Sequence, residues 1–130
     1  MIRVVPDTNI LISSIFWRGK PYNIIKGGIV GKYALITSKE ILEELTTELI
    51  TKFNLPEQAL LYLMDIIFTH FHVVQKVSNF NIARDSSDDK ILETAYDGKA
   101  DYIVTGDPDI LVLREFKGIR ILTAAQFLKL

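Results

Sequence analysis

The chain has 130 residues, of which 48% are hydrophobic and 24% are charged, and it contains no cysteine. This length and composition predict one globular domain over residues 1–130 and exclude a disordered chain. Without cysteine there is no disulfide framework, thiolate zinc site or catalytic thiol, and we expect a cytoplasmic location. The formal net charge of −1 argues against a protein that grips nucleic acid through a broad basic face.

Neither a leader segment nor a membrane span is expected. The N-terminus, MIRVVPDTN, lacks a basic start followed by a long apolar run. The longest apolar-rich stretch, residues 60–71, is interrupted by Asp65 and His70 and is too short to cross a bilayer. Basic side chains occur near the motifs described below, and we interpret them as solvated surface charges. They are Arg18, Lys20, Arg84 and Lys90.

Short apolar runs alternate with helical patterns along the chain. Pro21 and Pro56 suit the first turns of helices, Ser38 suits an N-cap, and Gly98 ends a helix. In chain order, the predicted elements are a strand at 2–5, a helix at 8–16, a helix from Pro21 to Gly28 or slightly beyond, a strand at 33–36, a helix from Ser38 with apolar positions to Leu49, a helix from Pro56 to Phe71, a strand at 73–74, a polar loop at 78–87, a helix at 88–97, a strand at 102–105, a helix at 108–113, a strand at 119–122 and a helix at 124–128.

This alternation predicts an α/β fold in which helices cover both faces of a mostly parallel sheet. Ligands bind such sheets beyond the carboxyl ends of the strands, where the strand order reverses. Two of the predicted strands run directly into aspartates, Asp7 and Asp107. If these strands are neighbours at that point, the two side chains meet at one edge of the sheet. Each aspartate also precedes a predicted helix, so an N-cap is the alternative role for each one taken alone.

Further carboxylates lie on two of the predicted helices. Asp88 and Asp89 open the helix at 88–97, where acidic residues in the first turn are common. On the Ser38 helix, a rotation of about 100° per residue points Glu43 away from the apolar stripe, whereas Glu44 flanks it. Glu44 is therefore eligible for a site at the edge of the core. The alternative for all of these acids is a solvated helix face.

Together these acids predict a site for a divalent metal ion. Several carboxylates held in one cleft repel each other unless a cation compensates them. Oxygen ligands without cysteine and with few histidines suit Mg²⁺ or Mn²⁺ rather than Zn²⁺. One or two such ions activate a water and stabilise the leaving oxygen of a phosphodiester, so no protein nucleophile is needed. His70 and His72 lie beside apolar residues, and we interpret them as structural.

At these residues the chain resembles the PIN-domain family. The matching segments are Asp7-Thr8-Asn9, Ser38-x-x-Ile41-Leu42-x-Glu44-Leu45, Asp88-x-x-Ile91-x-x-x-Ala95 and Ala100-Asp101-Tyr102-Ile103-Val104-Thr105-Gly106-Asp107. The last segment is the most specific, and the order and spacing of the four extend over nearly the whole chain. The resemblance implies a three-layer α/β/α fold, an acidic cluster that binds Mg²⁺ or Mn²⁺, and endonuclease cleavage of single-stranded RNA.

The family's acidic positions correspond to Asp7, Glu44, Asp88 and Asp107, which the resemblance implies as catalytic and metal-binding residues. Asp89 remains an alternative to Asp88, because similar sequences often carry a run of acids there and this chain has two serines before them. Asp109, two residues after the last motif, either assists Asp107 or only caps a helix. The implied supporting residues are Thr8, Asn9, Asp89, Thr105 and Asp109.

Many short prokaryotic PIN domains resemble the toxin half of toxin–antitoxin pairs. This implies a cognate antitoxin that blocks the cleft and often a homodimer, for which the apolar stripe of the Pro56 helix offers either a dimer face or core packing. The competing hypothesis is a catalytically silent PIN scaffold that binds RNA or a protein. A receiver domain is disfavoured because only Asp7 follows the first strand and no Lys-Pro lies near Ile121. A haloacid-dehalogenase phosphatase is disfavoured because Asp7-Thr8-Asn9 lacks a second aspartate.

Overall fold

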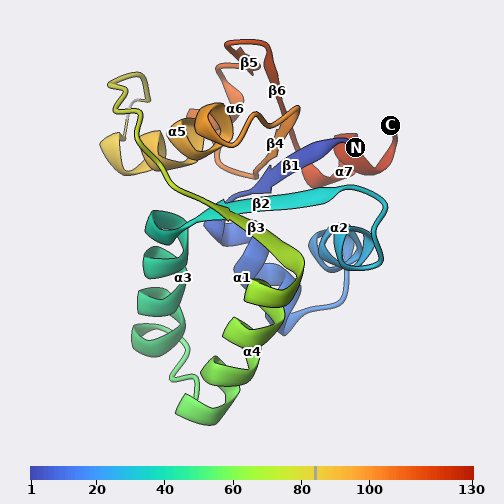
Figure 1. The fold of residues 1–130 in the computed structure, drawn as a ribbon, viewed down its shortest axis with the longest axis vertical. Helices are drawn as coiled ribbons and strands as arrows, with labels where there is room; N and C mark the ends of the chain where they lie inside the picture. Colours follow the sequence, from blue (N-terminus) through green and yellow to red (C-terminus); the bar gives the residue numbers. More distant parts are fainter. Residues whose placement is uncertain (84) are drawn as a thin grey trace.

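A six-stranded sheet forms the centre of the protein (Figure 1). The structure is a computed structural model that describes residues 1–83 and 85–130. The strand order is β3-β2-β1-β4-β6-β5, and all neighbouring strands are parallel except the pair β5–β6. The prediction of a mostly parallel sheet is therefore confirmed. The strands are β1 (Arg3–Pro6), β2 (Ala34–Ser38), β3 (Phe71–Val74), β4 (Tyr102–Val104), β5 (Glu115–Phe116) and β6 (Ile119–Leu122).

Helices cover both faces of this sheet. Figure 1 shows α5 and α6 on one side and α1, α2, α3 and α4 on the other, which confirms the three-layer α/β/α arrangement. A short 3₁₀ turn, η1 (Ser86–Asp88), precedes α5. The helices are α1 (Thr8–Phe16), α2 (Lys20–Ile29), α3 (Lys39–Thr51), α4 (Glu57–His70), α5 (Asp89–Asp97), α6 (Pro108–Leu111) and α7 (Ala124–Leu128).

Alternate residues of the central strand β1 face the two helical layers. Val4 and Val5 are both fully buried, but Val4 packs in a cluster with Ile24 of α2, whereas Val5 packs in a cluster that includes Leu92 of α5. Successive side chains of a strand point to opposite faces. A strand covered on both faces is therefore apolar throughout, which is why the start of the chain reads as an uninterrupted apolar run.

Helix α3 shows how local sequence sets the direction of its side chains. Ser38 ends β2 and also caps α3, where its hydroxyl accepts a hydrogen bond from the N–H of Ile41 at 3.4 Å. Leu45 and Leu49 are fully buried against the core. The side chain of Glu43 is 64% exposed, in agreement with the helical phase expected from the sequence. The same phase leaves the next glutamate facing the edge of the core.

The hairpin of β5 and β6 was not predicted from the sequence. The expected helix at 108–113 ends at Leu111, and Phe116 pairs with Ile119 across a two-residue turn. Lys117 and Gly118 in this turn have positive φ angles of 50° and 83°. Two positive φ angles define the mirror-type turn that suits a tight hairpin. Lys-Gly is not among the usual signals for this turn, and a two-residue strand is too short to show alternation. The local sequence therefore does not predict the hairpin.

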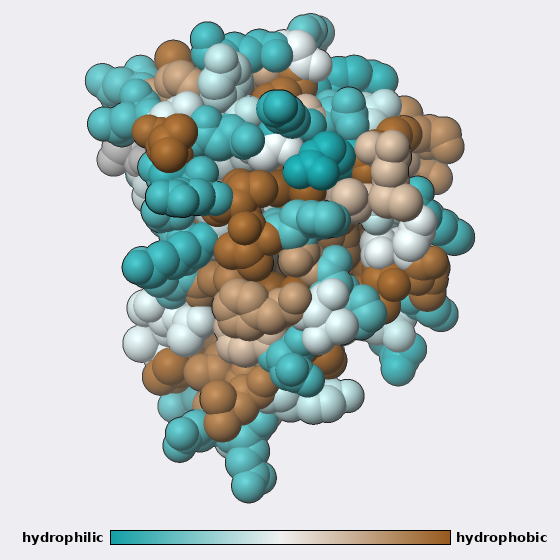
Figure 2. Space-filling model, in the orientation of Figure 1, coloured by the Kyte–Doolittle hydropathy of each residue, from teal (hydrophilic) through white to brown (hydrophobic). Residues whose placement is uncertain are grey.

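Helix α4 carries an apolar surface that the core does not cover. Ile67 is its one fully buried residue, whereas Leu61, Tyr62 and Phe68 are 62%, 70% and 62% exposed. Figure 2 shows hydrophobic side chains gathered on the lower part of this face, where α4 lies in Figure 1. Core packing alone therefore does not account for the apolar stripe of α4. No helix in the described part of the chain, α4 included, is both long and apolar enough to cross a membrane.

Candidate metal centre

The strand order brings the carboxyl ends of β1 and β4 together. Pro6 pairs with Val104, and the N–H of Asp7 donates to the carbonyl of Val104 at 3.0 Å. From β1 the chain continues to β2 on one side of β1, and it returns to form β4 on the other side. This is the point where the strand order reverses, at which ligands bind in sheets of this kind. Asp7 and Asp107 therefore follow neighbouring strands at the same edge of the sheet.

Asp7 caps α1 and is also a buried member of this edge. Asp7 is only 4% exposed. Its carboxylate accepts hydrogen bonds from the N–H of Ile10 at 2.8 Å and from the hydroxyl of Thr105. Burial raises the pKa of Asp7 to about 6, although both hydrogen bonds lower it, and the charges of Asp107 and Glu44 add to the rise. The two roles that the sequence offered as alternatives, cap and site residue, therefore coincide in one side chain.

Three aspartates from the starts of two helices converge beside Asp7. One carboxylate oxygen from each of Asp88, Asp107 and Asp109 lies within 4.8 Å of the other two. Asp107 caps α6 by accepting from the N–H of Asp109 at 2.9 Å. The N–H of Asp107 donates to the hydroxyl oxygen of Thr105 at 3.0 Å. Because that hydroxyl donates to Asp7, Thr105 links the two strand-end aspartates.

Within the described part of the chain, Asp88 is the member of this cluster with an unsatisfied buried oxygen. It occupies the N-cap position of α5 but makes no side-chain capping hydrogen bond. Its Oδ2 atom is buried and has no hydrogen-bond partner among the described residues. Burial raises the pKa of Asp88 to about 7, and the charge of Asp107, a side-chain hydrogen bond with Asp107 and the charges of Asp85 and Asp109 contribute to the rise. A buried carboxylate oxygen without a donor, close to other carboxylates, fits a divalent cation held by oxygen ligands.

Glu44 reaches the same place from α3. One of its oxygens accepts from the hydroxyl of Thr8, and the other pairs with the ammonium of Lys90 at 2.8 Å. The side chains of Lys90 and Glu44 are only 23% and 30% exposed. Lys90 is therefore not the solvated surface charge that we expected from the sequence. A lysine in the first turn of a helix opposes the helix dipole, and this unfavourable position was the signal that could have revealed it.

A cavity of about 170 Å³ collects these side chains. All four predicted acids line it together with two of the predicted supporting residues. Thr105 is joined to this lining because its hydroxyl donates a hydrogen bond to Asp7. Asp109 is joined to it because its carboxylate lies in the cluster with Asp88 and Asp107. Arg18 and Lys20 follow the opposite end of α1 from Asp7, and Arg84 lies outside the described residues. The cavity is lined by Asp7, Thr8, Asn9, Glu44, Glu48, Ser87, Asp88, Ile91, Asp107 and Ile110.

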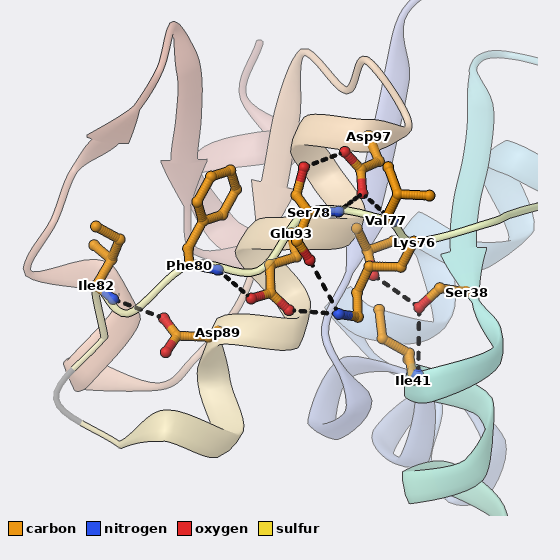
Figure 3. A network of polar contacts seen from close by, with 11 residues as sticks. Ser38, Ile41, Lys76, Val77, Ser78, Phe80, Ile82, Asp89, Glu93 and Asp97 are labelled. Atoms are coloured by element: carbon orange, nitrogen blue, oxygen red, sulfur yellow. Dashed lines mark hydrogen bonds and ion pairs between the residues drawn. The ribbon is translucent and has the colours of Figure 1, made fainter.

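Asp89 belongs to a different region from Asp88. It is only 5% exposed, and one of its oxygens accepts from the N–H of Ala83 at 2.8 Å and from the N–H of Ile82 at 3.2 Å, the second of which Figure 3 shows. Successive residues of a helix point about 100° apart, so neighbouring acids need not face the same surface. Of the two alternatives that the sequence left open, the structure places Asp88 in the aspartate cluster and Asp89 outside it.

Two further acids of α5 hold the same irregular segment, residues 76–83, in place. Glu93 accepts from the N–H of Phe80 at 2.6 Å and pairs with Lys76 at 2.8 Å. Asp97 accepts from two more N–H groups and one hydroxyl of the segment, at 2.5–2.8 Å. Figure 3 shows the three acids of α5 along this segment. They are spaced four residues apart, which places them on one helix face. The predicted polar loop is thus tied to α5 by carboxylates that the sequence analysis did not assign.

The cavity has the donor set of a magnesium or manganese site. Its charged lining residues in the described part of the chain are all carboxylates, and no histidine or cysteine joins them. Asp88, Asp107 and Asp109 are placed to hold a cation between them, with Asp7 and Glu44 on the adjoining walls. Oxygen ligands of this kind suit hard divalent ions. Such an ion offers positive charge to a phosphate group, which the carboxylates alone would repel.

Comparison with known proteins agrees with the geometry of the site. A family model described as the PIN domain matches residues 3–109. An uncharacterized protein of Methanocaldococcus jannaschii is 32% identical over 119 residues, which cover 88% of this chain and 76% of that protein. The crystal structure of VapBC2 from Rickettsia felis, bound to a DNA fragment from its promoter, matches with a TM-score of 0.67 and 16% identity over 94% of this chain and 98% of that one. This last likeness shows the fold, and the family model, which matches most of the chain, shows that the chain belongs to the PIN domain family.

Proposed function

We propose that the protein is a Mg²⁺- or Mn²⁺-dependent endoribonuclease that hydrolyses phosphodiester bonds of single-stranded RNA. Membership of the PIN domain family supports a nuclease. The observation that carries the metal dependence is the buried Oδ2 of Asp88, which has no partner among the described residues and lies in a cluster with Asp107 and Asp109. Carboxylates this close are stable at neutral pH when they share protons or hold a cation.

Each residue of the cavity then has a defined task. Asp88, Asp107 and Asp109 hold the ion, and a divalent ion held there supplies Lewis-acid stabilisation of the phosphodiester and promotes ionisation of the attacking water. The hydroxyl of Thr105 keeps Asp7 in place through one carboxylate oxygen. Because the N–H of Asp107 donates to that hydroxyl, the acids after β1 and β4 keep a fixed spacing. Fixed ligand positions lower the cost of reorganisation when charge develops in the transition state.

Cleavage of a labelled single-stranded RNA tests this function directly. We expect the parent protein to cut in Mn²⁺ or Mg²⁺ and to stop when a chelator is added in excess. Asp88→Asn should lose both the cleavage and the binding of Mn²⁺ seen by calorimetry. Glu43→Gln is the matched control, because it removes one carboxylate from the exposed face of the helix that carries Glu44. Full cleavage by Asp88→Asn, or cleavage unaffected by the chelator, would refute the metal site.

The preference for single-stranded RNA needs its own comparison. The same oligonucleotide sequence is supplied as single-stranded RNA, as single-stranded DNA and as an RNA duplex. We expect cutting of the first substrate and little cutting of the other two. Equal rates on DNA would restrict the assignment to a nuclease without RNA specificity.

A catalytically silent scaffold is the alternative function. It predicts a parent protein that binds RNA or a protein partner but cuts none of a varied set of RNAs with either metal ion. The grouping of Asp7, Glu44, Asp88 and Asp107 around one cavity favours catalysis over this alternative. A scaffold has no physical reason to keep four mutually repelling carboxylates together.

Two protein partners extend the proposal. One is a cognate antitoxin that covers the cavity, as the resemblance to toxin–antitoxin toxins implies. Co-expression of the protein encoded by the adjacent reading frame should then abolish RNA cleavage, and unchanged cleavage would count against the pair.

The second partner is another copy of this chain. The exposed apolar side chains of Leu61, Tyr62 and Phe68 on α4 support a homodimer, since a patch of this kind is unfavourable in water. Light scattering after size exclusion should show a dimer for the parent protein and a monomer for Phe68→Glu. A monomeric parent protein would contradict the proposal.

A further inference from the structure

Lys90 lines a second, larger hollow that lies beside the metal cavity. A groove of about 970 Å³ runs between α3 and the 76–83 segment, and Lys90 forms part of its lining. Glu44 and Glu48 line both the groove and the metal cavity. The ammonium of Lys90 is bound to Glu44 on this shared wall. A change in the position of Glu44 would therefore alter the wall that separates the two hollows.

The carboxylate of Glu44 is held by both of its oxygens. The hydroxyl of Thr8, from α1, holds one oxygen, and the ammonium of Lys90, from α5, holds the other at 2.8 Å. Three helices thus meet at one charged group. A glutamate side chain loses rotamer freedom when it is fixed, and the negative charge of Asp7 nearby repels it from the cavity. Without the two donors, solvent in the open groove offers Glu44 a more favourable position.

We propose that Lys90 is a positioning residue, which acts through Glu44 and keeps its carboxylate fixed beside the metal-binding aspartates. This role rests on the proposed function of the cavity as a metal site. Lys90 itself contacts neither the ion nor the RNA in this role. Residues that hydrogen-bond a metal ligand are known to affect metal affinity as strongly as many ligands do.

Binding of Mn²⁺ measured by calorimetry distinguishes positioning from simple charge. Removal of a positive charge beside a cation site should, by electrostatics alone, strengthen the binding of Mn²⁺. Positioning predicts the opposite sign, so we expect Lys90→Met to weaken Mn²⁺ binding by about tenfold, the lower end of the usual effect of such residues. Lys90→Arg, which keeps both charge and donors, should restore most of the affinity. Lys52→Met is the matched control, because Lys52 pairs with Glu48 on the groove wall but remains 66% exposed.

A double-mutant cycle tests whether Lys90 acts through Glu44. In a Glu44→Gln background, Lys90→Met should change Mn²⁺ affinity little, because the group that it positions has already lost its charge. Independent effects that multiply in the double variant would overturn the proposal, as would tighter Mn²⁺ binding by Lys90→Met alone. Thermal unfolding of each variant shows whether the fold is retained.

Steady-state cleavage of RNA adds a second readout. Positioning predicts a lower kcat for Lys90→Met with little change in KM, since ground-state binding of the RNA is not altered. A raised KM with unchanged kcat would instead assign Lys90 to direct contact with a phosphate, and the positioning role would be wrong. A parent protein that neither binds Mn²⁺ nor cuts RNA would refute the proposed function, and the positioning role with it. A parent protein that does both, while Lys90→Met behaves identically, would refute only the role of Lys90.

Discussion

Asp88 and Asp89 are neighbours in the chain, yet their carboxylates lie in two regions with opposite electrostatics. Asp89 accepts hydrogen bonds from two backbone N–H groups of the 76–83 segment, and Glu93 and Asp97 of the same helix face are satisfied in a similar way. Asp88 lies in the aspartate cluster of the candidate metal centre, and its buried Oδ2 has no partner among the described residues. The first region is electrostatically complete, whereas the second needs protons or a cation.

The pKa values of the two regions follow the same division. Burial raises the pKa of Asp97, but hydrogen bonds from Ser78 and Val77 outweigh it and hold the pKa below its ordinary value. Burial raises the pKa of Asp7 to about 6 and that of Asp88 to about 7, and neighbouring carboxylates add to the rise. Burial is therefore common to both regions. The supply of backbone donors distinguishes a structural acid from one that is ready to bind a cation.

The largest expected effect is on catalysis, in the metal centre. Asp107→Asn removes one of the three converging carboxylates and weakens the binding of the ion. Lewis-acid stabilisation is worth several kcal/mol, so we expect cleavage of RNA to fall by about a hundredfold or more. Single-turnover cleavage at a fixed Mn²⁺ concentration just sufficient for the parent protein measures this fall, and thermal unfolding should show a retained fold. An Asp107→Asn protein with more than half of the parent rate would remove Asp107 from the site.

The largest expected effect on stability is in the other region. Glu93→Gln leaves the ammonium of Lys76 without its carboxylate, and the two side chains are only 5% and 17% exposed. Removal of one partner should cost about 1–3 kcal/mol, because the charges of Glu40 and Asp97 still act on Lys76. Urea unfolding monitored by circular dichroism should show this loss. Calorimetry should show Mn²⁺ affinity close to that of the parent protein, and a large fall in affinity of the folded variant would abolish the distinction between the regions.

A smaller effect comes from the pair of neighbours themselves. Asp89→Asn weakens two hydrogen bonds to backbone N–H groups by removing the charge of the acceptor, which should cost about 1 kcal/mol of unfolding free energy. Asp88→Asn removes a charge that neighbouring carboxylates repel, so the metal-free protein should be no less stable at pH 8. Measurement of Mn²⁺ binding should give the reverse order, with a large loss of affinity for Asp88→Asn and little change for Asp89→Asn. Equal behaviour of the two variants in both assays would return the choice between Asp88 and Asp89 to an open question.

The metal centre should also respond to pH without metal. The folded-state pKa values of Asp7 and Asp88, about 6 and about 7, lie above the ordinary value of 3.8. Between the ordinary pKa and these raised values, the folded state binds more protons than the unfolded state. The protonated aspartates therefore add to the unfolding free energy fully below about pH 4, and this addition is lost as the pH rises through about 6 to 7. Melting temperatures in chelator should fall over this window, less steeply for Asp88→Asn. Excess Mg²⁺ should remove most of the fall. A steeper fall for the variant than for the parent protein would contradict the assignment.

The smallest expected effect is at Glu43. Its carboxylate pairs with Lys39 at 3.7 Å on the exposed face of α3, and exposed pairs of this spacing contribute little. Glu43→Gln should therefore leave RNA cleavage, Mn²⁺ affinity and unfolding free energy near the parent values. The adjacent variant Glu44→Gln should lower the first two. If Glu43→Gln caused the greater loss, the helical phase assigned to α3 would be reversed.

Much of the fold could be predicted because its signals are local. Helix α1 begins after Asp7 and α7 after Thr123, and both aspartate and threonine are favoured N-caps. The strand β6 has the predicted bounds, since Ile119–Leu122 lies between clear breaks in the helical pattern. The tie between the 76–83 segment and α5 could not be predicted in this way. Its carboxylates look like an ordinary solvated helix face until the segment is placed over them.

By itself, the sequence determined that acids follow two of the predicted strands and that Glu44, not Glu43, faces the edge of the core. These features depend on helical phase and on strand ends, which neighbouring residues control. Only the tertiary structure decided that Asp88 rather than Asp89 joins Asp107, and that Lys90 pairs with Glu44. The contacts that settle the site join residues far apart, such as Thr105 and Asp7, which are 98 positions apart. Whether a carboxylate finds a donor or another carboxylate is a property of packing, which no local pattern encodes.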